Sequence, residues 1–126
     1  MKSQKGQTLV ETALILPILL MLLFGITDFG RVFHVYLTLD HAGREAAREA
    51  SVGSEDAVIN LKIIDATSGL NKDKLGVSIT PVGKVNRASG TEVTIKITYP
   101  FDFLTPFIGE VIGPFNVENT TVMRVE

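Results

Sequence analysis

The feature that most constrains this chain is an apolar run from Leu9 to Ile26, which is polar only at Glu11 and Thr12. As a helix with a rise of about 1.5 Å per residue, the run spans roughly 27 Å, close to the hydrocarbon thickness of a bilayer. It therefore predicts a membrane helix. An ionisable side chain inside such a helix is costly, so Glu11 is expected to have a partner or a task.

The charges on either side of the run predict its orientation. Lys2 and Lys5 are the only charged residues before it, and Asp28 and Arg31 follow directly after it. Because lysines favour the cytoplasmic side of a membrane helix, we expect a single-pass protein of the cell membrane with a cytoplasmic N-terminus. Asp28 and Arg31 then mark the membrane exit, and the C-terminal domain lies outside, in the periplasm or the extracellular space.

Composition and motifs exclude several classes of protein. A length of 126 residues leaves room for one modest domain, and a net charge of −2 without a basic cluster argues against nucleic acid as a partner. The absence of cysteine excludes disulfide and thiolate-metal frameworks. His34, His41 and Glu45 share a helix face but offer too few converging ligands for a metal. We expect no catalytic residue, cofactor, metal or small-molecule substrate, and no enzyme activity.

The N-terminal residues permit three interpretations. A cleaved signal peptide also has a basic start and an apolar core, but no small-x-small cleavage site follows the run. An uncleaved signal anchor accounts for the lysines and the apolar residues and leaves Gly6 and Glu11 without a role. The third interpretation takes the stretch from Gly6 to Glu11 as a processing sequence.

That stretch, Gly-Gln-Thr-Leu-Val-Glu, resembles the processing site of type IV prepilins. The resemblance implies that a prepilin-type peptidase cuts between Gly6 and Gln7 and leaves the apolar helix on the mature protein. It also implies an assembly role for Glu11, whose carboxylate would pair with the new ammonium group of Gln7 in a neighbouring subunit. A local explanation stays open, because the helix dipole favours a carboxylate near a helix N-terminus.

A wider set of segments extends this resemblance. In chain order they are Gly6–Glu11, Leu16-Pro17, Phe24–Arg31 and Arg44–Arg48. As an ordered set they resemble the N-terminal half of the TadE-like proteins, pseudopilins of the tight-adherence (Flp pilus) secretion apparatus. The resemblance implies a non-enzymatic pilus subunit or assembly factor whose partners are membrane lipid, the peptidase and other pilin or pseudopilin subunits. The chain departs from the family at Thr12, where an aromatic residue is common. The alternative is a permanently anchored surface domain without a filament role.

Beyond the apolar run the helical pattern continues, with apolar residues at spacings of three and four: Phe29, Val32, Phe33, Tyr36 and Leu37. Ala42, Ala46 and Ala50 then form a small-residue stripe, which favours packing against the chain's own sheet and leaves packing between subunits open. Gly53 and Ser54 are expected to end this helix. The predicted divisions are a basic leader (1–6), a transmembrane helix (7–28), an amphipathic continuation (29–52) and a small external α+β domain (53–126).

The external domain is expected to hold a short second helix and about three antiparallel strands, which gives a pilin-like α+β fold. Ser54 is a candidate N-cap for a helix that extends to about Thr67. Its expected apolar stripe comprises Ala57, Val58, Leu61 and Ile64. Alternating patterns predict strands around Val77–Thr80, Val93–Tyr99 and Val117–Val125, with a hairpin connection over 83–90. Residues 100–115 hold four phenylalanines among prolines and glycines, which predicts an apolar loop or a broken turn of helix. Its rings are expected to fill the core, or otherwise to form a contact surface for another subunit or for the membrane face.

Overall fold

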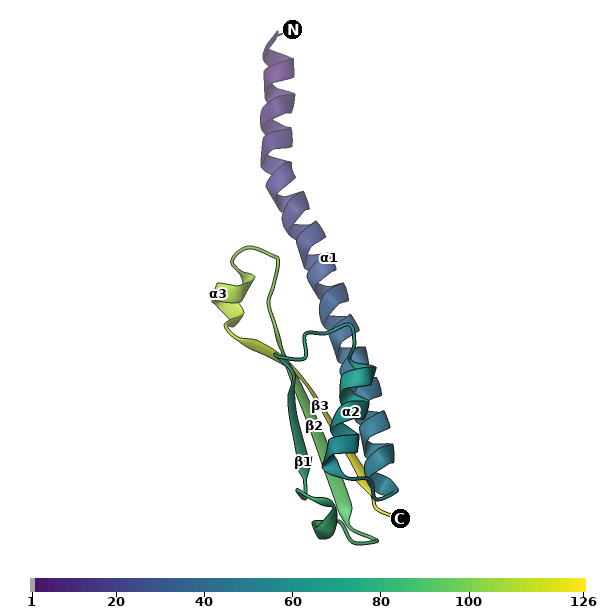
Figure 1. Ribbon diagram of the computed structural model, residues 1–126. Coiled ribbons are helices and arrows are strands. Elements are labelled where there is room, and N and C mark those ends of the chain that lie inside the picture. Colours follow the sequence, from purple (N-terminus) through teal and green to yellow (C-terminus); the bar gives the residue numbers. More distant parts are fainter. Residues whose placement is uncertain (1) are drawn as a thin grey trace.

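The computed structural model describes residues 2–126, which form an α+β fold on one very long helix (Figure 1). Helix α1 runs from Lys2 to Ser51 and continues through Pro17. Its 50 residues give a length of about 75 Å at 1.5 Å per residue. The elements after it are α2 (Asp56–Ala66), β1 (Gly76–Thr80), η1 (Lys84–Asn86), β2 (Glu92–Phe101), α3 (Ile108–Ile112) and β3 (Phe115–Arg124).

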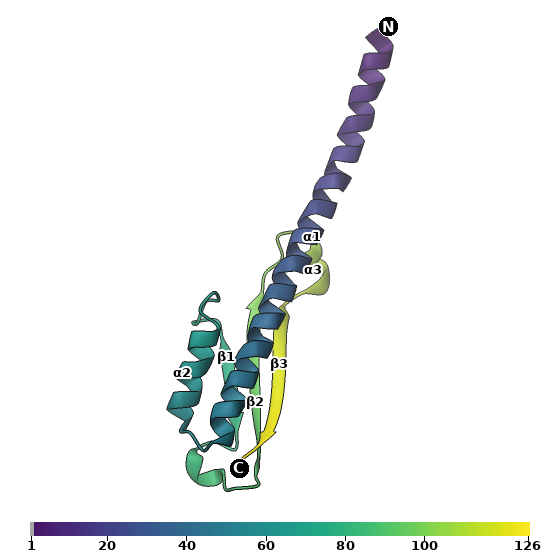
Figure 2. The same ribbon diagram turned by 90° about the vertical axis from the view of Figure 1, so that its right-hand side faces the viewer.

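The two halves of α1 have different surroundings. The N-terminal half stands clear of the rest of the chain (Figures 1 and 2) and is long and apolar enough to cross a membrane. The C-terminal half contacts α2, β2 and β3. Gly53, with φ of 82°, lets the chain turn after Ser51, because a positive φ strains other residues. The predicted end of the long helix is confirmed.

The three strands form an antiparallel sheet in the order β1-β2-β3, as the alternating patterns predicted. Ile95 at the centre of β2 lies opposite Ile79 of β1 and Thr121 of β3. Along β2, Val93, Ile95 and Ile97 are buried while the residues between them face outward. One face of the sheet therefore meets the helices, the common arrangement for an antiparallel sheet.

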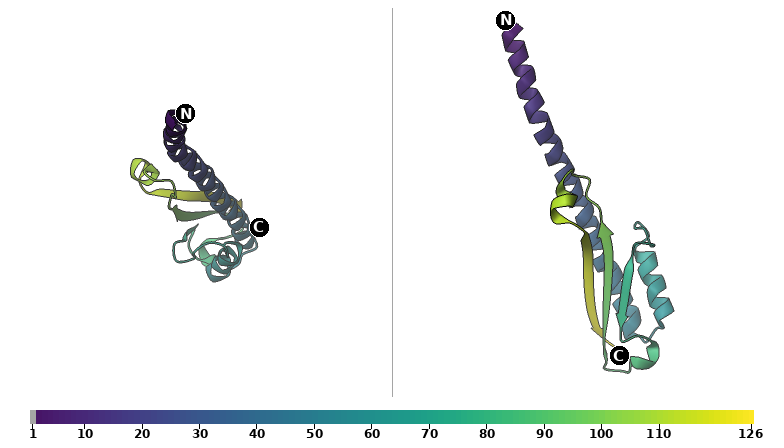
Figure 3. Two further views of the ribbon diagram at one scale, coloured as in Figure 1. Left: turned by 90° about the horizontal axis from the view of Figure 1, so that it is seen from above. Right: turned by 90° about the vertical axis from the view of Figure 1, so that its left-hand side faces the viewer.

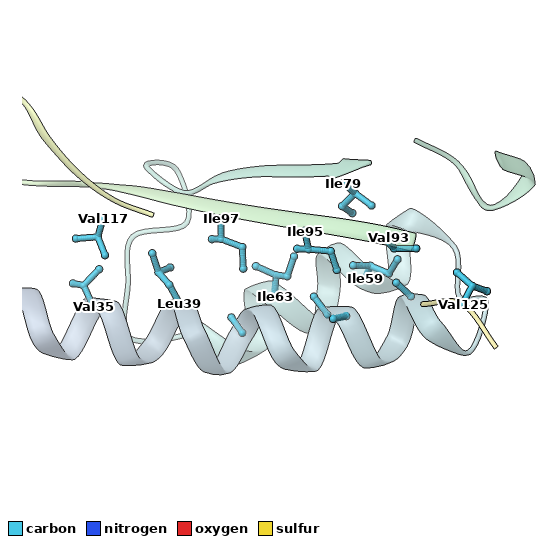
Figure 4. Packing of buried hydrophobic residues seen from close by; sticks show 14 of the residues in the cluster. Val35, Leu39, Ile59, Ile63, Ile79, Val93, Ile95, Ile97, Val117 and Val125 are labelled. Atoms are coloured by element: carbon cyan, nitrogen blue, oxygen red, sulfur yellow. The ribbon is translucent and has the colours of Figure 1, made fainter. Parts of the chain in front are cut away.

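The core lies between this face of the sheet and the helices α1 and α2 (Figure 4). Its buried members are Val35, Leu39, Ala42, Ala46, Ala47, Ala50, Ile59, Ile63, Ile79, Val93, Ile95, Ile97, Phe101, Val117 and Val125. The alanine stripe of α1 is fully buried against the chain's own domain. Packing within the chain, which the sequence favoured over packing between subunits, is thus confirmed for these alanines.

Two predictions about α2 are wrong. Ser54 does not cap the helix: its Oγ donates to Oε2 of Glu49 at 2.7 Å, and the N-cap is Glu55, in an extended conformation. The buried residues of α2 are Ile59 and Ile63, whereas Val58, Leu61 and Ile64 of the predicted stripe are exposed. Apolar residues lie on every side of this short helix, so periodicity alone did not select the buried face.

Candidate functional site

The predicted processing and assembly residues lie near the exposed N-terminal end of α1. A side chain at Gly6 would meet nothing within 4 Å apart from the helix itself. Nε2 of Gln7 donates to Oε1 of Glu11 at 3.3 Å, so these two side chains share one face of the helix. The hydroxyls of Thr8 and Thr12 donate to backbone carbonyls one turn back, at 3.0 and 2.9 Å. The carboxylate of Glu11 is therefore held by one long, exposed hydrogen bond.

Asp28, predicted as part of the membrane exit, forms the most densely bonded polar site near the apolar half of α1. Its carboxylate accepts hydrogen bonds from the backbone N–H of Leu104 at 2.9 Å and of Thr105 at 2.8 Å. It also accepts one from Oγ1 of Thr105 at 2.7 Å and one from Arg31 at 3.1 Å. Asp28 is only 4% exposed. The loop after β2 is thus fastened to α1 two residues beyond Ile26.

Arg31, the second predicted exit residue, strengthens the same junction. A guanidinium nitrogen that bonds Asp28 also donates to the backbone carbonyl of Asp102 at 3.3 Å. The guanidinium carbon lies 4.8 Å from the ring centroid of Phe101, a favourable distance for a cation–π contact. The structure therefore brings Asp28 and Arg31 together with residues 101–105, and reasoning from the sequence missed this contact.

The sequence shows only part of what predicts the contact between Asp28, Arg31 and residues 101–105. Asp28 and Arg31 have the spacing of a helical ion pair, which can be read from the sequence. Two of the four hydrogen bonds to Asp28, however, come from backbone N–H groups more than 70 residues away. Backbone donors have no residue signature, so only the folded chain identifies them.

The phenylalanines of residues 100–115 divide into two groups. Phe101, Phe103 and Phe115 form a cluster, with ring centroids 5.2 Å apart for Phe101 and Phe103 and 5.7 Å apart for Phe103 and Phe115. For these rings the predicted core role is confirmed, since Phe101 is buried and the other two pack against the core. It is wrong for Phe107, which is exposed and whose φ of 72° is left-handed.

An apolar groove of about 770 Å³ opens beside the Asp28 junction. One wall comes from α1, with Met21, Leu22, Gly25 and Phe29, and the other comes from residues 103–115. The groove therefore begins within the apolar half of the helix. Among residues 2–126, no group of three histidine, cysteine, aspartate or glutamate side chains is placed to hold a metal ion.

These features define a class: an α+β protein with one helix that could span a membrane and a small sheet domain on the other half of that helix. Residues 6–48 match the family model of the TadE-like proteins, and this match confirms the resemblance noted in the sequence. That family implies involvement in tight-adherence (Flp) pilus systems, with pilus machinery components as partners. No curated protein and no solved structure matches the chain.

Proposed function

We propose that this protein is a non-enzymatic, membrane-anchored pseudopilin-like subunit or assembly factor of a tight-adherence pilus or secretion system. The observation that carries the proposal is a face of α1 that the chain's own sheet leaves uncovered. Phe29, Phe33, Tyr36 and Leu37 are exposed there, and the rings of Phe29 and Phe33 stack with centroids 6.4 Å apart. Exposed aromatic patches of this kind are typical of protein contacts.

The exposed face continues the apolar half of α1, so one helix could serve both membrane anchoring and lateral packing. Lys2 and Lys5 at its start favour a cytoplasmic N-terminus. The external α+β domain, residues 53–126, would then lie in the periplasm or the extracellular space. Neighbouring subunits would pack along α1 from the membrane outward to about Leu37.

Processing at Gly6 is part of the proposal. A prepilin-type peptidase would cut between Gly6 and Gln7. In low-dielectric surroundings, pairing with a carboxylate would stabilise the new ammonium group of Gln7. Glu11 of a neighbouring subunit supplies one, since its present hydrogen bond to Gln7 is long and exposed and costs little to exchange. Pairing would also compensate the cost of placing Glu11 near hydrocarbon.

The N-terminal sequence of the protein recovered from host membranes tests the processing step. We expect Gln7 as the first residue in the wild type and no cleavage in Gly6→Leu. Because a side chain at position 6 has open space around it, the variant should still fold. An uncut wild type that begins at Met1 would support a permanently anchored surface domain, and a start beyond Thr27 would support a cleaved signal peptide.

The assembly role of the carboxylate has its own test. We expect Glu11→Gln to be cleaved normally and to show fewer cross-links to pilus components in host membranes, because glutamine keeps the size of the side chain and removes its charge. Glu45→Gln, on the part of α1 that carries the external domain, is the matched control. Normal assembly of the Glu11→Gln protein would contradict a charge-pairing role.

A further inference from the structure

The segment from Leu104 to Gly113, here called the apolar tip, contains α3 and projects from the end of the sheet (Figures 1 and 3). Four of its large apolar side chains are exposed: Leu104, Phe107, Val111 and Ile112. Val111 is the most exposed of them, at 82%. Glu110 is the only charged residue in the tip. A surface of this kind is poorly suited to water.

The tip lies beside the part of α1 where the apolar run ends. The hydrogen bonds to Asp28 hold Leu104 and Thr105 at the first turn beyond the apolar run. From there the tip lies on the N-terminal side of the sheet (Figure 2), and the groove beside it reaches back to Met21. Met21 lies seven positions before Asp28, which is about 10 Å along a helix. The groove therefore overlaps the last two turns of the apolar run.

We propose that the apolar tip inserts into the outer leaflet and that lipid acyl chains fill the groove between it and α1. The proposal rests on the proposed membrane anchoring of α1. With the membrane surface near Asp28, the groove wall from Met21 to Gly25 lies within the hydrocarbon. Interfacial segments enter a bilayer to a depth of about 5–10 Å, which agrees with the reach of this groove.

The chemistry of the groove favours lipid over a second copy of the chain. Its α1 wall is continuous with the exposed apolar face of the span, which lipid surrounds in a membrane. Its charged lining residue, Asp28, lies at one end of the groove and pairs there with Arg31, whose side chain is partly exposed. Charges at this end and apolar side chains beyond it match the order of headgroup and acyl chain. Glu110 is exposed and free to turn toward the headgroups.

Depth-dependent fluorescence quenching tests the proposal on the full chain in liposomes. The chain has no cysteine, so one introduced thiol gives a single labelling site for an environment-sensitive dye. Val111→Cys reports on the tip, Leu19→Cys on the membrane span, and Val85→Cys on the exposed helix η1 at the other end of the domain. The liposomes contain phosphatidylcholine with a nitroxide on the acyl chain, and iodide serves as the aqueous quencher.

We expect the dye at Val111 to be quenched by the nitroxide lipid and protected from iodide, as at Leu19, while the dye at Val85 shows the reverse. Iodide quenching at Val111 with lipid quenching at Leu19 would overturn the inserted tip and leave the anchor intact. Iodide quenching at both sites would overturn the anchor and the inserted tip with it. Protection at Val111 that disappears on dilution of the protein in lipid, without nitroxide quenching, would assign the groove to a second copy and overturn the proposal.

Discussion

At the scale of single residues, Arg87 shows how much one buried charge organises the external domain. Its side chain is fully buried and bonds the carboxylate of Asp56 at the start of α2. It also donates to the backbone carbonyl of Pro81 at 3.1 Å and to that of Ser54 at 2.9 Å. The backbone N–H of Gly83 donates to the other oxygen of Asp56 at 3.0 Å. These bonds join the start of α2 to the connection between β1 and β2.

This cluster predicts a pH dependence. Burial raises the pKa of Asp56, but the hydrogen bonds from Arg87 and Gly83 and the charge of Arg87 outweigh burial and hold the pKa below its usual value. The folded state therefore releases this proton at a lower pH than the unfolded state does. The stabilisation is complete above about pH 5 and is lost as the pH falls through the lowered pKa.

We expect Asp56→Asn to lower the free energy of unfolding by about 2–3 kcal/mol at pH 7, because it leaves the guanidinium of Arg87 buried without its counter-charge. The loss should shrink as the pH falls through the lowered pKa, because the wild-type carboxylate is then protonated as well. Denaturant unfolding of the full chain in detergent across this pH range measures both effects. Asp65→Asn, an exposed position on the same helix, is the matched control. A loss for Asp56→Asn that stays constant from pH 7 to pH 2 would contradict the ion-pair explanation.

At the scale of elements, two glycines of α1 differ in what an added side chain would contact. A side chain at Gly30 would meet nothing within 4 Å apart from the helix itself. At Gly43 a Cβ would lie 2.5 Å from both Oδ1 of Asn119 and Oγ1 of Thr121 on β3. Asn119 also bonds Asp40 of α1 at 3.2 Å, so β3 approaches the helix closely at this point. The same substitution should therefore have opposite effects at the two positions.

We expect Gly30→Ala to raise the free energy of unfolding by about 0.5–1 kcal/mol, because alanine favours the helix and lowers the entropy of the unfolded chain. Gly43→Ala gains the same amount but must displace Asn119 and Thr121, at about 1–3 kcal/mol. Its net effect should be a loss of about 1 kcal/mol. Thermal unfolding of the two variants in detergent compares them directly. Stabilisation by Gly43→Ala would mean that the side chains of Asn119 and Thr121 on β3 move aside at little cost in free energy.

The elements differ in how well the sequence predicted them. The strand β2 was predictable because apolar and polar residues alternate along Val93–Tyr99. The buried face follows directly from that alternation. The helix α2 was predictable in its extent and not in its orientation, because its eleven residues carry apolar side chains on all sides. Its buried face depends on Ile59 and Ile63 meeting the sheet and α1, a tertiary effect that no short window contains.

At the scale of the whole molecule, the sequence predicted one long helix with a membrane-compatible half and a small sheet domain on the other half. It did not predict which outer face of α1 the sheet would leave free. Phe29, Val32, Phe33 and Tyr36 share one spacing pattern, yet Val32 packs toward the core while the three aromatic residues are exposed. The division depends on the side of α1 that meets the sheet, where Val35 and Leu39 are buried, and this is a tertiary contact that the spacing does not encode.

That free face gives the last prediction. Phe33 is 52% exposed, so Phe33→Ser should change the free energy of unfolding by no more than about 0.5 kcal/mol. It removes the ring that stacks on Phe29 and interrupts the apolar face along which neighbouring subunits would pack. We expect markedly fewer cross-links to pilus components in host membranes and fewer pili by electron microscopy. Leu61→Ser, 60% exposed on α2, is the matched control and should leave both unchanged. Equal assembly of the Phe33→Ser and Leu61→Ser proteins would mean that subunits meet this protein elsewhere than on the aromatic face of α1.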